Sequence, residues 1–188
     1  MEEAYAAGLF GRNILGSDFS CDIVVYRGAG AYVAGEASGL ISSLEGKKGY
    51  PRNRPPRLTV KGLYQRPTVV NNVESLSNIA WIINNGADAF KAVGTPKSPG
   101  TRLFSVSGHI NRPGVYEVEL GYPWMKFLDE DCGGVPHGRA IKCVVPGGVS
   151  SKVLTGADIA NLKLSHEDLW DAGSTLGSGG MIVIAEST

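Results

Sequence analysis

The sequence has few cysteines, no excess of charge and no long apolar run, and each shortage excludes a class of protein. Its three cysteines, Cys21, Cys132 and Cys143, lie far apart, without the spacing of a metal site or the even count of a disulfide framework. Eighteen Lys and Arg balance eighteen Asp and Glu, which leaves no electrostatic footprint for nucleic acid. No segment is long and apolar enough to span a membrane. We therefore expect a reduced, cytosolic chain without direct membrane insertion.

The sequence also lacks the arrangements typical of acid–base, nucleophilic or metal catalysis. The three histidines, His109, His137 and His166, are scattered among loop-like segments. No serine or cysteine is placed as a partner for them, and no His/Glu spacing fits a metal ion. We accordingly predict no catalytic side chain and no metal ligand.

Glycine, in contrast, is abundant, with 26 residues in the chain. Gly28, Gly30 and Gly35 lie between an apolar strand predicted over residues 21–26 and a helix predicted over residues 36–44. A strand, a glycine-rich turn and a helix form the arrangement with which α/β proteins bring backbone close to a phosphorylated cofactor. The turn is therefore a candidate ligand loop.

Neither common phosphate-binding fingerprint is complete in this turn. The third glycine of a dinucleotide-binding G-x-G-x-x-G would fall on Val33. The lysine of a P-loop would fall on Glu36, whose carboxylate suits the positive end of the helix dipole. On spacing alone, a structural turn and a ligand loop are equally open.

A second helix is predicted from Asn71 to Gly86. Asn71 as N-cap with Glu74 three residues later resembles a capping box. The apolar positions at helical spacing form one stripe: Val73, Leu76, Ile79, Ala80 and Ile83. Before this helix, residues 49–57 are rich in proline and arginine, a composition compatible with a surface connector.

The second half of the chain changes to short strands. The segments expected to be regular are a hairpin over residues 103–107 and 115–120, a helix near 124–128, and strands over 141–145 and 181–185. A hairpin, a crossing helix and a further strand describe a β-grasp-like unit. The glycine-rich run 173–180 precedes a strand and not a helix, so we interpret it as a structural turn.

These elements predict an α/β fold in three parts. Residues 1–99 are expected to belong to an α/β domain, and residues 100–152 to a small β-grasp domain. Residues 153–188 are expected to be a connector and a strand leading toward a further domain. A helix at the first residue and a buried strand at the last indicate an internal fragment of a longer protein.

Several motifs together resemble one protein family over essentially the whole chain. They are Ala4–Gly8 with Asn13–Ser17, Gly28–Glu36, Ser43–Gly46, Pro51–Pro56, Pro67–Glu74 and Pro146–Ser150. In these motifs the chain is similar to the NADH-binding flavoprotein subunit of respiratory complex I, also called the 51 kDa or F subunit. The flavoprotein subunits of NAD-reducing hydrogenases and NAD-dependent formate dehydrogenases are its relatives.

The resemblance implies a partial Rossmann-like FMN-binding layer followed by a ubiquitin-like, SLBB-type β-grasp domain. It implies FMN and NADH as cofactors, with hydride passing from NADH to FMN and electrons passing on through iron–sulfur clusters toward quinone. The residues it assigns to the cofactor pocket are Gly28, Gly30, Tyr32, Gly35, Glu36, Asn71 and Asn72. Many family members carry a second glutamate where this chain has Ala37, which departs from the pattern.

The resemblance also implies partners and a location. The partners are other peripheral-arm subunits, especially the thioredoxin-like [2Fe–2S] subunit of the 24 kDa type. The location is the bacterial cytoplasm, peripheral on the cytoplasmic side of the inner membrane. The family's FMN-phosphate loop and the cysteines of its [4Fe–4S] cluster have no counterpart here, so we expect the chain alone to be inactive. The alternatives are a non-catalytic split or truncated paralogue that serves as an assembly or binding module, and the flavoprotein of an NAD-reducing hydrogenase or formate dehydrogenase.

Overall fold

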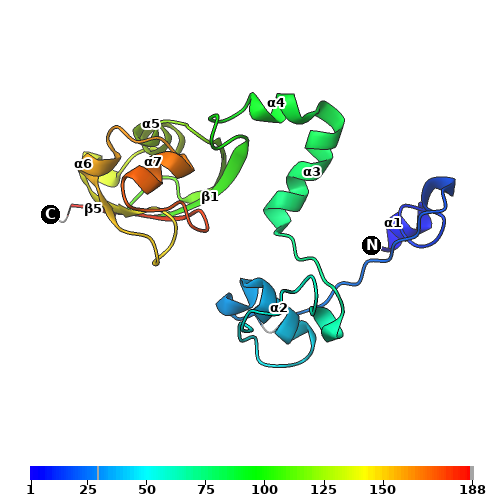
Figure 1. The fold of residues 1–188 in the computed structure, drawn as a ribbon. Helices are drawn as coiled ribbons and strands as arrows, with labels where there is room; N and C mark the ends of the chain where they lie inside the picture. Colours follow the sequence, from blue (N-terminus) through cyan, green and yellow to red (C-terminus); the bar gives the residue numbers. More distant parts are fainter. Residues whose placement is uncertain (29, 187–188) are drawn as a thin grey trace. The chain divides into compact units, whose positions relative to one another are not determined.

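The computed structural model describes residues 1–28 and 30–186, which belong to two compact units, Met1–Asn72 and Val73–Thr188. Ala29, part of the glycine-rich turn, lies outside the described residues. In the first unit the elements are α1 (Glu2–Ala6), η1 (Ile14–Gly16), η2 (Tyr32–Gly35), α2 (Ala37–Leu44) and η3 (Leu63–Gln65) (Figure 1).

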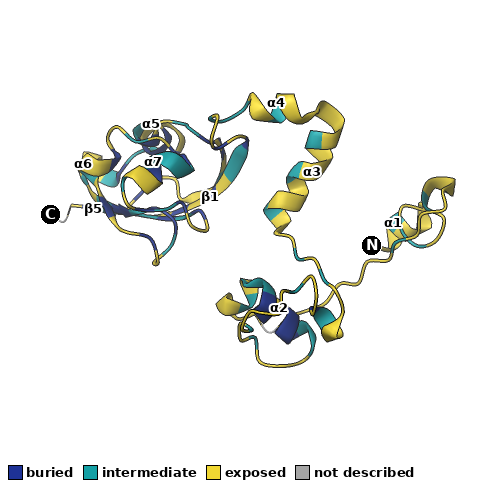
Figure 2. Ribbon diagram, in the orientation of Figure 1, coloured by how far each residue is buried: buried dark blue, intermediate teal, exposed yellow. Residues whose placement is uncertain are grey.

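The first unit is organised around helix α2, one side of which is buried and appears dark blue in Figure 2. Ile41 is 1% exposed, and the rest of the buried side of the helix is made of small residues. Gly39 packs so closely that a Cβ there would lie 2.9 Å from the carbonyl oxygen of Val33 and 3.0 Å from that of Gly49. Small residues on α2 therefore let two loops lie directly against the helix.

Serine hydroxyls on α2 hold one of these loops by hydrogen bonds. The backbone N–H of Arg52 donates to Ser38 Oγ at 2.8 Å, and the Nε of Arg52 donates to Ser42 Oγ at 3.1 Å. Ser42 Oγ also lies 3.3 Å from the carbonyl oxygen of Tyr50, to which it can donate. The proline- and arginine-rich segment is thus packed on the helix and is not a free connector.

The Glu45 carboxylate fastens the end of α2 to two further segments. Its Oε2 lies 2.8 Å from Lys47 Nζ and 2.9 Å from Arg52 Nη2, and its Oε1 accepts from the backbone N–H of Tyr64 at 2.9 Å. The Glu45 side chain is only 4% exposed. The hydrogen bonds from Lys47 and from the Tyr64 N–H lower the pKa of Glu45 to about 2.

The strand predicted over residues 21–26 does not form. These residues have no strand partner beyond an isolated bridge between Gly11 and Cys21, and Val24 and Val25 are 86% and 75% exposed. A single extended segment leaves its backbone groups unpaired, because strands are stabilised by neighbours. The predicted strand is therefore wrong, because apolar composition does not specify a partner strand.

The second unit begins with α3 (Val73–Asn85) and α4 (Ala87–Lys91), separated by Gly86 at φ +89°. The predicted helix is confirmed, but it starts at Val73, which moves the capping position from Asn71 to Asn72. Glu74 Oε1 accepts from the backbone N–H of Leu103 at 3.0 Å. The carboxylate thus bonds to a strand, and the predicted capping box is wrong in register.

The predicted apolar stripe of α3 is not its packed side. Leu76 and Ile79 are 48% and 46% exposed, and Ile83 is 76% exposed. The half-buried positions are instead Glu74, Asn78 and Ile82, which recur every four residues. Periodicity predicted the helix correctly, but the side that is half-buried within this unit is formed by Glu74, Asn78 and Ile82 and not by the predicted stripe.

A five-stranded mixed sheet forms the body of the second unit. Its strands are β1 (Thr101–Gly108), β2 (Gly114–Glu119), β3 (Ile141–Val145), β4 (Leu154–Thr155) and β5 (Gly180–Ala185), in the order β2-β1-β5-β3-β4. Strands β1 and β2 are the predicted antiparallel hairpin. Strand β5 runs parallel to β1 and antiparallel to β3. The mixed α/β class predicted from the sequence is confirmed.

The sheet corrects the predicted domain boundaries. Strand β5, assigned from sequence to a part that leads away from the β-grasp unit, lies in the centre of its sheet, with Met181 and Val183 fully buried. Within the described residues, the predicted strand of this part therefore completes the sheet and does not lead away from it. The first boundary also falls earlier than residue 99, because residues 73–99 group with the sheet. An apolar strand looks the same in sequence whichever sheet it completes, so its neighbours could not be predicted.

The short helices of the second unit close over this sheet. They are α5 (Trp124–Lys126), η4 (Phe127–Asp131), η5 (Pro136–Gly138), α6 (Gly156–Ile159) and α7 (His166–Asp171). The predicted face of the 124–128 helix is confirmed, because Trp124, Phe127 and Leu128 are all fully buried. Phe127 also packs edge-on against Tyr116 of the hairpin at a centroid distance of 5.5 Å. Among the described residues, no helix has the length and apolarity that a membrane crossing requires.

Two glycine-containing turns meet beside β5 with almost no space between them. A Cβ at Gly147 would lie 2.3 Å from the carbonyl carbon and oxygen of Leu176, and one at Gly177 would lie 2.1 Å from the carbonyl oxygen of Gly147. Backbone cannot move aside as a flexible side chain can. The 173–180 run is thus occupied in packing, as expected for a structural turn.

Replacing Gly147 by alanine should destabilise the second unit by about 1–3 kcal/mol, the usual cost of overpacking. Trp124 lies in the core of this unit, so urea unfolding followed by tryptophan fluorescence measures the effect. Gly180→Ala is the matched control, because its Cβ would meet only Ser178 Oγ at an ordinary 3.6 Å. Equal stability of the two variants would contradict the close packing.

Acid should release the segments that Glu45 holds. Because its folded pKa is depressed to about 2, the stabilisation is complete above the ordinary value near 4.5 and is lost as the pH falls toward 2. Hydrogen exchange of the α2 amides should therefore be severalfold faster in Glu45→Gln than in the parent at neutral pH, and equal in both near pH 2. Glu3→Gln, at an exposed position in α1, should match the parent throughout.

Candidate functional site

The candidate site begins at the turn that leads into helix α2. Residues Tyr32–Gly35 form one 3₁₀ turn, closed by hydrogen bonds from the N–H of Ala34 to the carbonyl of Ala31 and from the N–H of Glu36 to the carbonyl of Val33. The Tyr32 side chain is not packed in this turn, and the residue is 92% exposed. The turn thus presents an aromatic ring to its surroundings.

Glu36 is the N-cap of α2, so the predicted placement at the positive end of the helix is confirmed. Its Oε2 accepts from the backbone N–H groups of Ser38 and Gly39, each at 2.9 Å, and from the Ser38 hydroxyl. These bonds, led by the one from Ser38, lower the pKa of Glu36. The carboxylate is therefore ionised at neutral pH and fixed in direction.

The second oxygen of Glu36 faces a guanidinium group. Its Oε1 lies 3.3 Å from Arg54 Nη2, and the two side chains are 38% and 59% exposed. At such exposure the pair contributes little stability and can rearrange at small cost. One oxygen of Glu36 is thus fixed by the helix, while the other is shared with an exposed arginine.

A pocket of about 760 Å³ lies beside this pair. Its lining residues come from the start of α2 and from the loop before α3: Ala37, Arg54, Pro55, Arg57, Leu58, Thr59, Thr68, Val69 and Val70. We call it the arginine pocket. Its volume is within the range of small-molecule sites. Two guanidinium groups and no carboxylate line it, so the pocket favours an anionic group such as a phosphate.

The structure places the sequence-predicted site residues unequally around this pocket. Ala37 and Val70, which line it, are the sequence neighbours of Glu36 and Asn71. Glu36 itself lies at its edge through the pair with Arg54. None of the predicted residues is among those that line the pocket; Gly28, Gly30, Tyr32, Gly35, Asn71 and Asn72 are exposed, and Glu36 is half-buried.

The glycines of the turn leave open space where side chains would stand. Gly30 has φ +76°, and a Cβ at Gly30 or Gly35 would meet no atom within 4 Å. The backbone at these two positions is therefore accessible to a ligand. The packing around Gly35 does not itself require a glycine there. Their assignment as ligand contacts stays a prediction.

Sequence reasoning missed the two residues that give the pocket its charge, Arg54 and Arg57. Both lie in the segment that composition presented as a connector. The structure shows that the arginines of this segment have different roles. Arg52 is used in packing on α2, whereas Arg57 makes no described side-chain bond and lines the pocket. Composition does not reveal which arginine in such a run is held and which is free.

His109 and His166 make contacts within the fold, and Cys132 is buried. His109 Nδ1 accepts from the backbone N–H of Ala185 at 3.0 Å, and His166 lies 3.3 Å from Arg102 Nη1. Burial raises the pKa of the Cys132 thiol to about 11, which keeps it protonated. In the part of the chain that the structure describes, no three His, Cys, Asp or Glu side chains are grouped closely enough for a metal ion.

Comparison with known proteins identifies the family. Residues 1–81 match the family described as the Nuo51 FMN-binding domain. The F subunit of the NADH-quinone oxidoreductase of Rickettsia bellii is 43% identical over 189 residues, which is 100% of this chain and 45% of that protein. The F subunit of the Mycobacterium tuberculosis enzyme is 47% identical over 186 residues, which is 99% of this chain and 41% of that protein.

A solved structure shares the fold. The crystal structure of an NAD⁺-reducing [NiFe]-hydrogenase in the H₂-reduced state matches 88% of this chain and 28% of that chain, with a TM-score of 0.75 and 38% identity. The present chain thus spans less than half the length of these relatives. Residues 1–81 thus belong to the family of the Nuo51 FMN-binding domain, and over essentially its whole length the chain is similar in sequence to the F subunits of NADH-quinone oxidoreductases.

Proposed function

We propose that the chain forms part of the FMN- and NADH-binding site of an NADH dehydrogenase flavoprotein. The observation that carries this proposal is the arginine pocket beside the Glu36 turn, within the residues that match an FMN-binding domain. When bound, FMN accepts hydride from NADH and releases electrons singly, chemistry that no side chain of this chain needs to supply. The protein's task is to bind and orient.

We assign the arginine pocket to the phosphate groups of NADH. Arg54 and Arg57 would each give charge-assisted hydrogen bonds to phosphate oxygens. Arg54 can turn from Glu36 toward the anion, since their 3.3 Å pair is solvent-exposed.

We assign the ring systems and hydroxyl groups of the cofactors to the Glu36 turn and the asparagine pair. The exposed Tyr32 ring would pack against a flat ring system, and Gly35 would leave space for that ring beside the backbone. Once Arg54 turns to the anion, Oε1 of Glu36 would accept from a ribose or ribityl hydroxyl. Asn71 and Asn72 follow the pocket-lining Val70, and their amides can both donate and accept.

The remaining assignments concern the second unit and the assembly. We propose that the five-stranded sheet with its short helices is the family's SLBB-type β-grasp domain. We also propose peripheral-arm subunits as partners, the thioredoxin-like [2Fe–2S] subunit of the 24 kDa type among them, on the cytoplasmic side of the membrane. The names of the relatives support a multisubunit enzyme.

A hydrogenase flavoprotein is the second candidate. The 38% identity to the NAD⁺-reducing hydrogenase is close to the identities with the quinone-linked relatives. Both candidates use NADH or NAD⁺ and differ in the electron partner. Co-purification of the chain with a [NiFe]-hydrogenase of its own cells would favour the second candidate.

Arg57→Ala should weaken NADH binding about tenfold, because it removes a charged donor worth roughly 1.5–3 kcal/mol. The measurement is a titration of the chain with NADH, followed by nucleotide fluorescence. Arg12→Ala is the matched control, since Arg12 is an exposed arginine of the same unit that does not line the pocket. Reduced nicotinamide riboside, which lacks phosphate, should bind equally to all three proteins. An equal loss of NADH affinity in Arg12→Ala would exclude the arginine pocket as the site of the NADH phosphate groups.

A further inference from the structure

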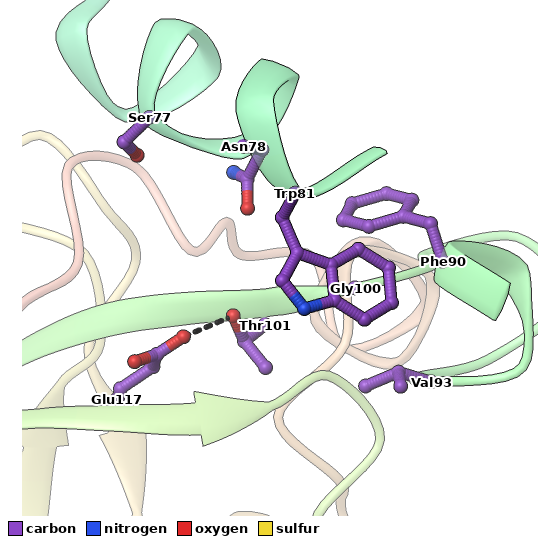
Figure 3. A pocket seen from close by; sticks show the side chains of 8 residues that line it. All are labelled: Ser77, Asn78, Trp81, Phe90, Val93, Gly100, Thr101 and Glu117. Carbon is purple, nitrogen blue, oxygen red and sulfur yellow. Dashed lines mark hydrogen bonds between the residues drawn. The ribbon is translucent and has the colours of Figure 1, made fainter. Parts of the chain in front are cut away.

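A second pocket, of about 410 Å³, lies within the Val73–Thr188 unit and is lined by residues of α3, α4 and the β1–β2 hairpin. Figure 3 shows its lining residues: Ser77, Asn78, Trp81, Phe90, Val93, Gly100, Thr101 and Glu117. We call it the Trp81 pocket. None of the residues assigned to FMN or NADH lines it, so its occupant is a separate question.

One wall of the Trp81 pocket is aromatic. The Trp81 and Phe90 rings lie 6.2 Å apart between centroids, tilted by 58°. In Figure 3 the indole of Trp81 extends from α3 across the hairpin, with the Phe90 ring beside it. Trp81 remains 44% exposed. An exposed indole face is the best side-chain surface for a cation.

Three polar side chains of the pocket already donate hydrogen bonds. Thr101 Oγ1 donates to Glu117 Oε1 at 2.6 Å, the contact drawn as a dashed line in Figure 3. Ser77 Oγ and Asn78 Nδ2 both donate to the carbonyl oxygen of Glu74, at 2.7 and 2.9 Å. The acceptors offered to a ligand include the amide oxygen of Asn78 and the second carboxylate oxygen of Glu117.

The charge of the pocket is negative and unbalanced. In the described part of the chain, Glu117 forms no ion pair with a lysine, arginine or histidine. An aromatic wall, free acceptors and one carboxylate match a flat, donor-rich cation. The guanidinium group fits this description, because it is planar, always charged and carries five N–H donors.

We propose that the Trp81 pocket binds an arginine side chain presented by a partner protein. The surface around the pocket favours a protein over a small free cation. In the β1–β2 register Leu103 stands opposite Glu117, and Ser105 opposite Val115, so these side chains share the outer face of the hairpin. Leu103 and Val115 are 49% and 67% exposed there. An arginine anchor beside exposed apolar residues is the pattern of a protein interface.

The test uses blocked peptides and the full chain labelled with ¹⁵N. The probes are Ac-Leu-Arg-Leu-amide, the same peptide with citrulline in place of arginine, and the small cation agmatine. The signal is the indole N–H resonance of Trp81, identified by its loss in Trp81→Phe. We expect the arginine peptide to bind about fivefold more tightly than the citrulline peptide and than agmatine, a ratio typical of an accessible cation site.

Glu117→Gln should reduce arginine-peptide binding about fivefold and leave citrulline-peptide binding unchanged. Glu119→Gln is the matched control, because Glu119 lies on the same strand and face, removes the same charge, and does not line the pocket. Thr101→Val should give an intermediate loss, since Glu117 then lacks the hydrogen bond that orients its carboxylate. NADH binding should be the same in all three variants.

Three outcomes would overturn the proposal. Equal binding of the arginine and citrulline peptides would exclude recognition of the charge. An equal effect of Glu117→Gln and Glu119→Gln would indicate attraction by net charge and not by the pocket. Binding of agmatine as tight as that of the peptide would assign the pocket to a small free cation.

Discussion

The candidate site depends on the carboxylates at the two ends of helix α2. Glu36 begins the helix and faces Arg54, and Glu45 follows its end and holds Arg52 and the backbone of Tyr64. Residues 47–62, which follow the helix and bond to both carboxylates, have no regular secondary structure. Side-chain bonds therefore supply the order that a strand or helix would otherwise give. The arginine pocket exists because this irregular segment is fixed against a short helix.

The sequence predicted the local elements of the first unit better than their environment. The helix at residues 36–44 and the place of Glu36 at its positive end follow from side chains close to each other in the chain, and both were predicted correctly. The strand at 21–26 was not, because a strand requires a neighbour that no local pattern specifies. The role of Arg54 and Arg57 in the pocket was not predicted, for a similar reason. Their neighbours in the pocket, Thr68 and Val70, lie more than ten residues further along the chain.

In the second unit, too, local patterns were predicted and contacts between distant parts of the chain were not. The hairpin and the buried helix at 124–128 have clear periodic patterns, and the structure confirms them. The exposed side of α3 and the central place of β5 depend on contacts between distant parts of the chain. Trp81 shows what a sequence pattern can and cannot predict. Its position on α3 is plain from the sequence, but its pairing with Phe90 and its approach to Glu117 are not.

The place of β5 in the sheet has a consequence for how the second unit acquires its structure. Met181 in β5 and Ser107 in β1 are 74 residues apart in the chain, yet Ser107 Oγ lies 3.3 Å from the carbonyl oxygen of Met181. The strand that separates β1 from β3 is thus the last of the five to leave the ribosome. Sheets built on such distant pairings fold slowly, since a long loop must close before the contacts form. Until then the inner edges of β1 and β3 are both open to other strands, and newly made chains are at their most vulnerable to aggregation.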